Sequence, residues 1–170
     1  MSATPADTSP RPPHGRHRPD ATPVLVLEDS DDDFDTVLEA FRAGGHVGDV
    51  RRATSGDECL KRLRDAFDRS AIAEDRPAVV LMDLNVPGLD GRDALRVIKK
   101  DERLRSLPVV VHTTSAHPND LELCYSRGAN AYHVKPVSYP KHLEVLQRVF
   151  GYWLKSVVLP EGVGGGRHRA

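Results

Sequence analysis

Apolar and polar positions alternate along this chain in two different periods, and the pattern predicts an α/β fold. Short runs rich in Val, Leu and Ala predict strands at 24–27, 50–53, 78–82, 108–112 and 131–134. Between them, apolar residues recur every three or four positions, which predicts helices around 34–41 and 59–67 and over about 91–103, 119–127 and 138–156. The alternation predicts one doubly wound parallel sheet of five strands, with right-handed crossovers and helices on both faces.

Turn and capping residues set the expected limits of these elements. The first helix is expected to stop at Gly44 and Gly45. Ser55 and Glu58 have the spacing of a capping box, which opens the second helix. Asp90 precedes the third helix and is expected to cap it. The strand at 50–53 is short and polar, so we expect it at an edge of the sheet.

The two ends of the chain lack apolar periodicity. Residues 1–22 are rich in Pro, Ser, Thr and Arg, and residues 161–170 are rich in Gly and Arg. Such segments bury too little surface to offset their ordering entropy, so we expect solvated, disordered tails around one domain at 23–160. The arginines of the tails could also contact nucleic acid, but solvation is the simpler interpretation.

Composition excludes several classes of protein. The formal net charge of the 170 residues is -1, which gives no general attraction to nucleic acid or to acidic membranes. No apolar stretch is long enough for a membrane span, and the amino-terminal residues lack the apolar segment of a secretory signal. The two cysteines fall inside predicted helices and suggest no disulfide framework. We expect a cytoplasmic protein.

Acidic residues crowd the end of the first predicted strand. Glu28 and Asp29 follow it directly, and three more aspartates occupy 31–33. A calcium loop starting at Asp29 is excluded, because its sixth residue is Phe34 instead of Gly and its twelfth is Ala40 instead of Glu. The aspartates at 31–33 suit the amino end of a helix. Glu28 and Asp29 are better explained as part of a site for a divalent cation such as Mg²⁺.

Asp83 is the most informative residue of the chain. It ends the apolar run 78–82 and precedes a break at Pro87 and Gly88, as expected of a strand that delivers a carboxylate to the carboxyl edge of the sheet. Ligands of open α/β sheets bind at that edge. Asn85 follows two residues later and could offer its backbone carbonyl to a metal. A lone acid at this position could equally be an ordinary loop or capping residue.

Two further strands end in residues suited to a phosphoryl group. A hydroxyl at Thr113 or Thr114 could donate to a phosphoryl oxygen, and spacing alone does not separate the two. By strand alternation the His112 side chain points away from the Thr113 side chain, so we expect a structural role for His112. Lys135 could neutralise phosphate charge or form a simple ion pair. We expect a cis peptide bond at Pro136, which would fix the direction of the lysine.

Together these residues resemble a known family, the receiver domains of two-component response regulators. The resemblance covers about residues 22–155 and rests on Glu28, Asp29, Asp83, Thr113, Tyr132, Lys135 and Pro136. It implies a flavodoxin-like sheet with the strand order 2-1-3-4-5. Within the family the chain looks most like the single-domain regulators paired with bacterial phytochromes. The narrower resemblance rests on the Glu-Asp pair, the segment 111–115 and the segment 152–160.

The resemblance implies a role for each matching residue. Asp83 would accept a phosphoryl group from a histidine kinase, and the narrower resemblance implies a kinase of the bacteriophytochrome type. Asn85 and Ser115 lie where this family tunes dephosphorylation. Mg²⁺ would be held by Glu28, Asp29, Asp83 and the Asn85 backbone carbonyl, with Glu28 acting directly or through water. The residues that bind the phosphoryl group and report it would be Thr113, Lys135 and Tyr132.

The residues after 156 are too few for a DNA-reading domain, so we expect output through protein contact. The last predicted helix carries two apolar stripes, and a receiver helix needs one for its own core. The second stripe suggests a homodimer surface made by Val145, Val149, Tyr152, Trp153 and Val157. One wide buried face is the alternative.

Two rival functions deserve comparison. An aspartyl-nucleophile phosphatase would place a second acid two residues after the nucleophile, where this chain has Asn85, and would use the first strand. A phosphorylation-independent binding module with a receiver fold would not need the acids, the threonine and the lysine. We therefore expect a signalling protein that promotes its own phosphorylation and dephosphorylation, and no enzyme with a separate substrate.

Overall fold

Five strands alternate with five helices in the computed structural model, which describes residues 22–68, 76–160 and 163. The strands are β1 (Val24–Leu27), β2 (Val50–Ala53), β3 (Val79–Met82), β4 (Val109–Thr113) and β5 (Ala131–Val134). The helices are α1 (Asp31–Ala43), α2 (Gly56–Asp68), α3 (Gly91–Lys100), α4 (Pro118–Ser126), α5 (Tyr139–Gly151) and a π-helical turn, η2 (Tyr152–Ser156).

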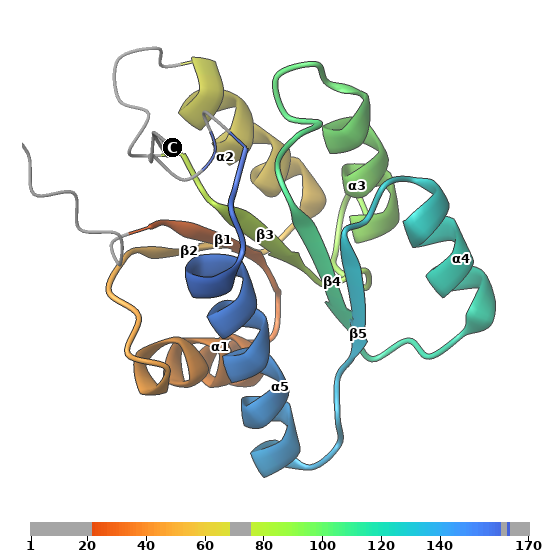
Figure 1. Cartoon of the computed structure of the whole chain (residues 1–170). Coiled ribbons are helices and arrows are strands. Elements are labelled where there is room, and N and C mark those ends of the chain that lie inside the picture. The colour runs from red at the N-terminus through yellow and green to blue at the C-terminus, as the bar shows by residue number, and fades with distance from the viewer. Residues whose placement is uncertain (1–21, 69–75, 161–162, 164–170) are drawn as a thin grey trace, which may run out of the picture.

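All strand pairs are parallel, and the order across the sheet is β2-β1-β3-β4-β5. The predicted topology and the edge position of β2 are confirmed. Helices cover both faces, with α1 and α5 side by side on one and α2, α3 and α4 on the other (Figure 1). Because all five strands are parallel, their carboxyl ends lie along the same edge of the sheet, called here the carboxyl edge.

Each face of the sheet has its own apolar core. Alternate residues of a strand point to opposite faces, so Leu25 and Leu27 join the core under α2 and α3, while Val24 and Val26 join the core under α1 and α5. β1 and β3 are buried along their whole length. The sheet is therefore a rigid support for the loops that follow it.

The residues that cap the helices lie largely where the sequence predicted them. The Ser55 hydroxyl accepts a hydrogen bond from the Glu58 N–H (3.2 Å), and the Asp90 carboxylate accepts one from the Asp93 N–H (3.1 Å). Gly45 follows α1 with a φ of 68°, a left-handed conformation that glycine adopts without strain. The third helix ends at Lys100, earlier than expected, because Asp101 takes an extended conformation.

The expected fifth helix divides in two. α5 ends at Gly151, and η2 continues the chain with a wider turn that closes through the Val157 N–H and the Tyr152 carbonyl (3.0 Å). The Lys155 ammonium donates to the Gly44 carbonyl (2.9 Å), which ties this turn to the end of α1. No described helix has both the length and the apolar character that crossing a membrane requires.

The predicted tails fall mostly on residues that the structure does not describe, which are 1–21, 161–162 and 164–170. Val163 is an exception. Its side chain is 2% exposed and packs in the core under α2 and α3, together with the half-buried Leu159. The prediction of a solvated tail is wrong at this residue, because its apolar side chain packs into that core.

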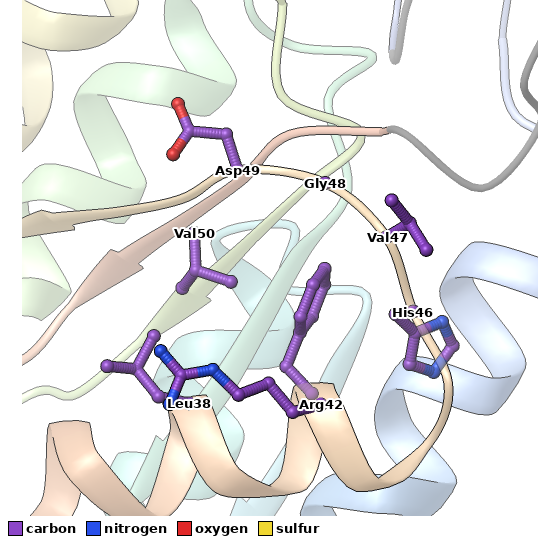
Figure 2. A pocket seen from close by; sticks show the side chains of 8 residues that line it. Leu38, Arg42, His46, Val47, Gly48, Asp49 and Val50 are labelled. Atoms are coloured by element: carbon purple, nitrogen blue, oxygen red, sulfur yellow. The ribbon is translucent and has the colours of Figure 1, made fainter.

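A cavity of about 390 Å³ lies at the amino end of the sheet, between α1 and the segment that leads into β2. Figure 2 shows Val50 directed towards Leu38 of α1, while the Asp49 carboxylate points the other way. The lining includes none of the predicted site residues. The hollow therefore lies apart from the predicted site.

Candidate functional site: an acidic cluster around Lys135

A buried lysine organises the carboxyl edge of the sheet. The Lys135 ammonium, just after β5, donates to carboxylate oxygens of Glu28 (2.6 Å), Asp33 (2.8 Å) and Asp83 (2.8 Å). Glu28, Asp83 and Lys135 are all buried. One cation therefore contacts three carboxylates, and the cluster keeps an excess of negative charge that favours additional positive charge.

Three carboxylates lie close enough to hold a metal ion together. Oxygens of Glu28, Asp29 and Asp83 fall within 4.8 Å of one another, and Asp29 is open to solvent. Hard oxygen donors with one side left to water suit Mg²⁺. Asn85 is exposed in the loop after Asp83, where its backbone carbonyl could complete the set. The residues present therefore fit the metal ion that the sequence predicted.

Burial and charge shift the ionisation of the cluster in opposite ways. Desolvation raises the pKa of Glu28, and the hydrogen bond and charge of Lys135 oppose it. Desolvation also lowers the pKa of Lys135, but its hydrogen bonds to Asp33, Asp83 and Glu28 outweigh burial and raise the pKa above the usual range. The lysine therefore stays cationic at neutral pH and is suited to meet an anionic group.

The loop after β3 presents the Asp83 carboxylate. The Asn85 N–H donates to one carboxylate oxygen of Asp83 (3.2 Å), and Lys135 donates to the other. Gly91 starts α3 against the same loop. A Cβ at this position would lie 2.2 Å from the Asp83 carbonyl oxygen, so only glycine permits this approach.

Thr113 and Tyr132 flank the neighbouring loop. Thr113 ends β4, is 0% exposed, and its carbonyl accepts from the Lys135 N–H (2.7 Å), whereas Thr114 is exposed. The Tyr132 hydroxyl donates to the Ser115 carbonyl (2.9 Å), so its ring is turned inward against the core under α3. The Ser115 N–H in turn lies 3.4 Å from the Thr113 hydroxyl. These contacts connect the two residues through one loop.

His112 lies on the opposite face of β4 from the core under α3, as alternation predicted. Its ring packs on that of His142 from α5, with centroids 4.8 Å apart. Both rings are buried, and within the described part of the chain neither Nε2 atom has a hydrogen-bond partner. Desolvation chiefly, with nearby cations, holds the pKa of His112 well below its ordinary value. His112 is therefore a neutral core residue.

The expectation of a cis peptide bond at Pro136 is wrong, since the described residues contain no cis peptide bond. The trans form is intrinsically favoured even before proline. Lys135 is held instead by the hydrogen bond from its N–H to β4 and by the three carboxylates around its ammonium. These contacts fix its direction without help from the proline.

Sequence reasoning missed two residues that support the site. Asp33 was assigned to the helix dipole, yet it also contacts Lys135. Arg52 of β2 donates to the backbone carbonyls of Glu28 (2.8 Å) and Asp29 (2.9 Å) and to the Asp31 carboxylate (2.7 Å). It therefore holds the acidic loop in place. The one available signal was a charged residue in a short strand beside that loop.

The predicted dimer surface is smaller than expected. Val149 is 4% exposed and belongs to the core under α5, so its assignment to a surface is wrong. Val145 and Trp153 are half-buried against the same core. Tyr152 is exposed and Val157 is half-buried. The buried face of α5 is wide because α1 packs alongside it as well as the sheet.

Known proteins share this fold and edge chemistry. Residues 24–147 match the family model described as the response regulator receiver domain. The chain is 35% identical over 133 residues to the probable methanogenesis regulatory protein FilR2 of Methanothrix harundinacea, covering 77% of this chain and 83% of that protein. It is 32% identical over 145 residues to response regulator Rcp1 of Synechocystis sp., covering 81% and 92%.

Two solved structures agree with these sequence matches. The phosphorylated cyanobacterial phytochrome response regulator RcpA superposes with a TM-score of 0.76 at 28% identity, over 83% of this chain and 99% of that one. The Mn²⁺-bound form of Rcp1 superposes with a TM-score of 0.74 at 30% identity, over 82% and 99%. From its family match, sheet order and acidic edge, this chain belongs to the response regulator receiver domain family.

Proposed function

We propose that this protein is a stand-alone response regulator that accepts a phosphoryl group on Asp83 from a histidine kinase, with Mg²⁺ as cofactor. The observation that carries the proposal is the contact of the Lys135 ammonium with Asp83, which is one of three carboxylates able to share a metal ion. The match to Rcp1 over 92% of its length supports a single receiver domain as the working unit. Family members are signalling proteins, which supports this role over that of an enzyme with a separate substrate.

Phosphoryl transfer follows from the residues at the edge. A carboxylate oxygen of Asp83 attacks phosphorus, the bond from phosphorus to the kinase imidazole breaks, and its electron pair returns to that imidazole. Lys135 neutralises charge on the arriving group as a point donor, and Thr113 donates its hydroxyl. Glu28, Asp29 and Asp83 would hold Mg²⁺, which would supply further stabilisation of the charge on the transferred group.

The change at Asp83 is then reported through the loop after β4. The phosphoryl group brings negative charge and acceptor oxygens that attract Thr113. Because Ser115 joins Thr113 to the Tyr132 hydroxyl, we propose that Tyr132 acts as the aromatic residue that changes rotamer on phosphorylation.

Acetyl phosphate with Mg²⁺, followed by intact mass analysis, tests this function. We expect the wild type to gain one phosphoryl group and to lose the gain in EDTA. Asp83→Asn should gain nothing, while Asp49→Asn, an exposed acid at the opposite end of the sheet, should behave as wild type. Absence of any adduct in the wild type would favour the alternative, a binding module that works without phosphorylation.

We propose that the kinase is a bacteriophytochrome-type sensor, which is supported by the similarity to RcpA, named as a phytochrome response regulator. We also propose that this protein works in the cytoplasm, because its two free, buried cysteines fit a reducing compartment. Such a kinase, once phosphorylated on its histidine, should transfer the phosphoryl group to the wild type. Over the same period Asp83→Asn should stay unlabelled. Labelling by unrelated kinases at the same rate would contradict this partner.

We also propose output through protein contact, beginning with a homodimer around η2. Tyr152 is 53% exposed and Val158 73% exposed, beside the half-buried Trp153 and Val157. Tyr152→Glu should convert a dimer to a monomer in light scattering at micromolar concentration. Val47→Glu is a matched control, since Val47 is also 53% exposed but lies by the amino end of β2. A monomeric wild type, with or without a phosphate analogue, would contradict the dimer.

A further inference from the structure

Arg92 joins the two loops that flank Asp83. It lies in the first turn of α3, and its guanidinium donates two hydrogen bonds, of 2.7 and 2.8 Å, to the Asp120 carboxylate of α4. Each side chain of the pair is only 20% exposed. A two-pronged contact of this kind fixes the plane of the guanidinium as well as its position.

The same guanidinium reaches the loop after β3. It donates to the Asp90 carboxylate (3.1 Å) and to the side-chain oxygen of Asn85 (3.4 Å). The last contact is long for a hydrogen bond. The amide oxygen of Asn85 nevertheless faces the guanidinium, which Asp120 and Asp90 hold in place.

The second loop is attached through Asp120. The Ser115 hydroxyl donates to the Asp120 carboxylate (2.6 Å), which also carries the guanidinium. Interaction with Arg92, and next with Ser115, holds the pKa of Asp120 well below its usual range, so this carboxylate is ionised at neutral pH. Asn85, Arg92, Asp120 and Ser115 thus form one continuous chain across the mouth of the site.

This chain determines which group Asn85 can offer to a neighbour. A side-chain amide has one accepting oxygen and two donating N–H groups. With the oxygen turned to Arg92, the amide keeps its N–H groups for other partners. A water that attacks phosphorus needs an acceptor for its hydrogens, and N–H groups cannot serve as one.

We propose that Arg92 is a positioning residue that turns the Asn85 carboxamide oxygen away from the attacking water and thereby prolongs the phosphorylated state of Asp83. The inference rests on the proposed function. In the reaction it slows, water oxygen bonds to phosphorus and the bond from phosphorus to the Asp83 oxygen breaks. The electron pair stays on the Asp83 carboxylate, and the protons of water leave on inorganic phosphate and to solvent.

Loss of the phosphoryl group tests the inference when the full chain is first phosphorylated with acetyl phosphate and Mg²⁺ and then freed of the donor. Arg92→Gln should lose the group roughly fivefold faster than the wild type, the size expected from one additional oriented hydrogen bond. The matched control is Arg96→Gln, because Arg96 lies on the same helix and forms its ion pair with Asp93. It should decay at the wild-type rate.

Asn85→Ala separates positioning from a general loosening of the fold. If Arg92 acts through the Asn85 amide, Arg92→Gln combined with Asn85→Ala should decay at the rate of Asn85→Ala alone. An unchanged or slower decay in Arg92→Gln overturns the inference, as does an acceleration that persists without Asn85. A wild type that never forms the adduct overturns the proposed function and the inference with it, so the two failures are distinguishable.

Discussion

Two buried polar clusters lie near the carboxyl ends of the central strands, and they are built in opposite ways. The lysine cluster, made by Glu28, Asp33, Asp83 and Lys135, consists of charged groups that contact one another and open to solvent through Asp29. The histidine pair, His112 and His142, is neutral and closed, with both Nε2 atoms unpartnered within the described part of the chain.

The difference shows that burial of polar groups does not by itself indicate function. The lysine cluster holds three acids for one base, so it gains from a cation. The histidine pair has no opposite charge in contact, and its environment keeps both rings uncharged. A functional site is recognised here by an uncompensated charge that solvent can reach.

The largest effect is expected when the lysine is removed. Lys135→Met leaves two buried carboxylates and Asp33 without their common partner, which should reduce the free energy of unfolding by about 3 kcal/mol. Urea denaturation measures this loss. Lys141→Met removes an exposed lysine and should change stability by no more than about 0.5 kcal/mol. Equal stabilities would show that the cluster needs no internal cation.

Metal binding should stabilise one cluster and leave the other unaffected. At a concentration about 100 times its dissociation constant, Mg²⁺ should raise the free energy of unfolding by about 2.7 kcal/mol. Asp29→Asn should reduce the gain, because one of the three grouped carboxylates is lost. His112→Leu should retain it. A full gain in Asp29→Asn would place the ion elsewhere.

Acidification should act most clearly on the histidine pair. Burial is the main cause that lowers the pKa of both rings. A proton on His112 would also be repelled by Lys135 and by protonated His142 and His133. For His142, Asp33 opposes the shift and Lys135 adds to it. Below about pH 6.5 the histidines of the unfolded chain therefore bind protons that the same histidines of the native protein do not bind. The free energy of unfolding consequently decreases as the pH falls below about 6.5.

Replacing both rings isolates this contribution. A variant with leucine at 112 and 142 should lose less stability than the wild type between about pH 7 and pH 5 in thermal denaturation. The raised pKa of Glu28 contributes in the opposite direction, since the native protein takes up that proton more readily. Because Glu28 is unchanged in the variant, the difference between the two slopes reports the histidines. Parallel slopes would contradict neutral, buried rings.

Local signals were sufficient for the framework and for the centre of the site. Strand ends are visible in sequence as apolar runs that stop at a polar residue, which is why Asp83 and Lys135 were found. A parallel sheet then brings such ends together without further information. The sheet order required the family resemblance, since periodicity does not rank the strands.

Contacts between distant elements were not visible. Asp33 and Arg52 act on the site from other elements, and their own segments suggest only a helix dipole and an edge strand. Val149 was misplaced for a related reason, because a helical stripe does not reveal how many elements pack on it. At Pro136 the lysine–proline pair suggested a cis bond, but the intrinsic preference for trans holds, and contacts around the Lys135 ammonium fix the direction of the lysine.

The central claim is that Asp83 receives the phosphoryl group. Borohydride reduction of the acetyl phosphate-treated protein converts a phosphorylated aspartate to homoserine, and peptide mapping then locates it. We predict homoserine at position 83, formed only in the presence of Mg²⁺. Homoserine at Asp29 or Asp33 with Asp83 intact would contradict the account.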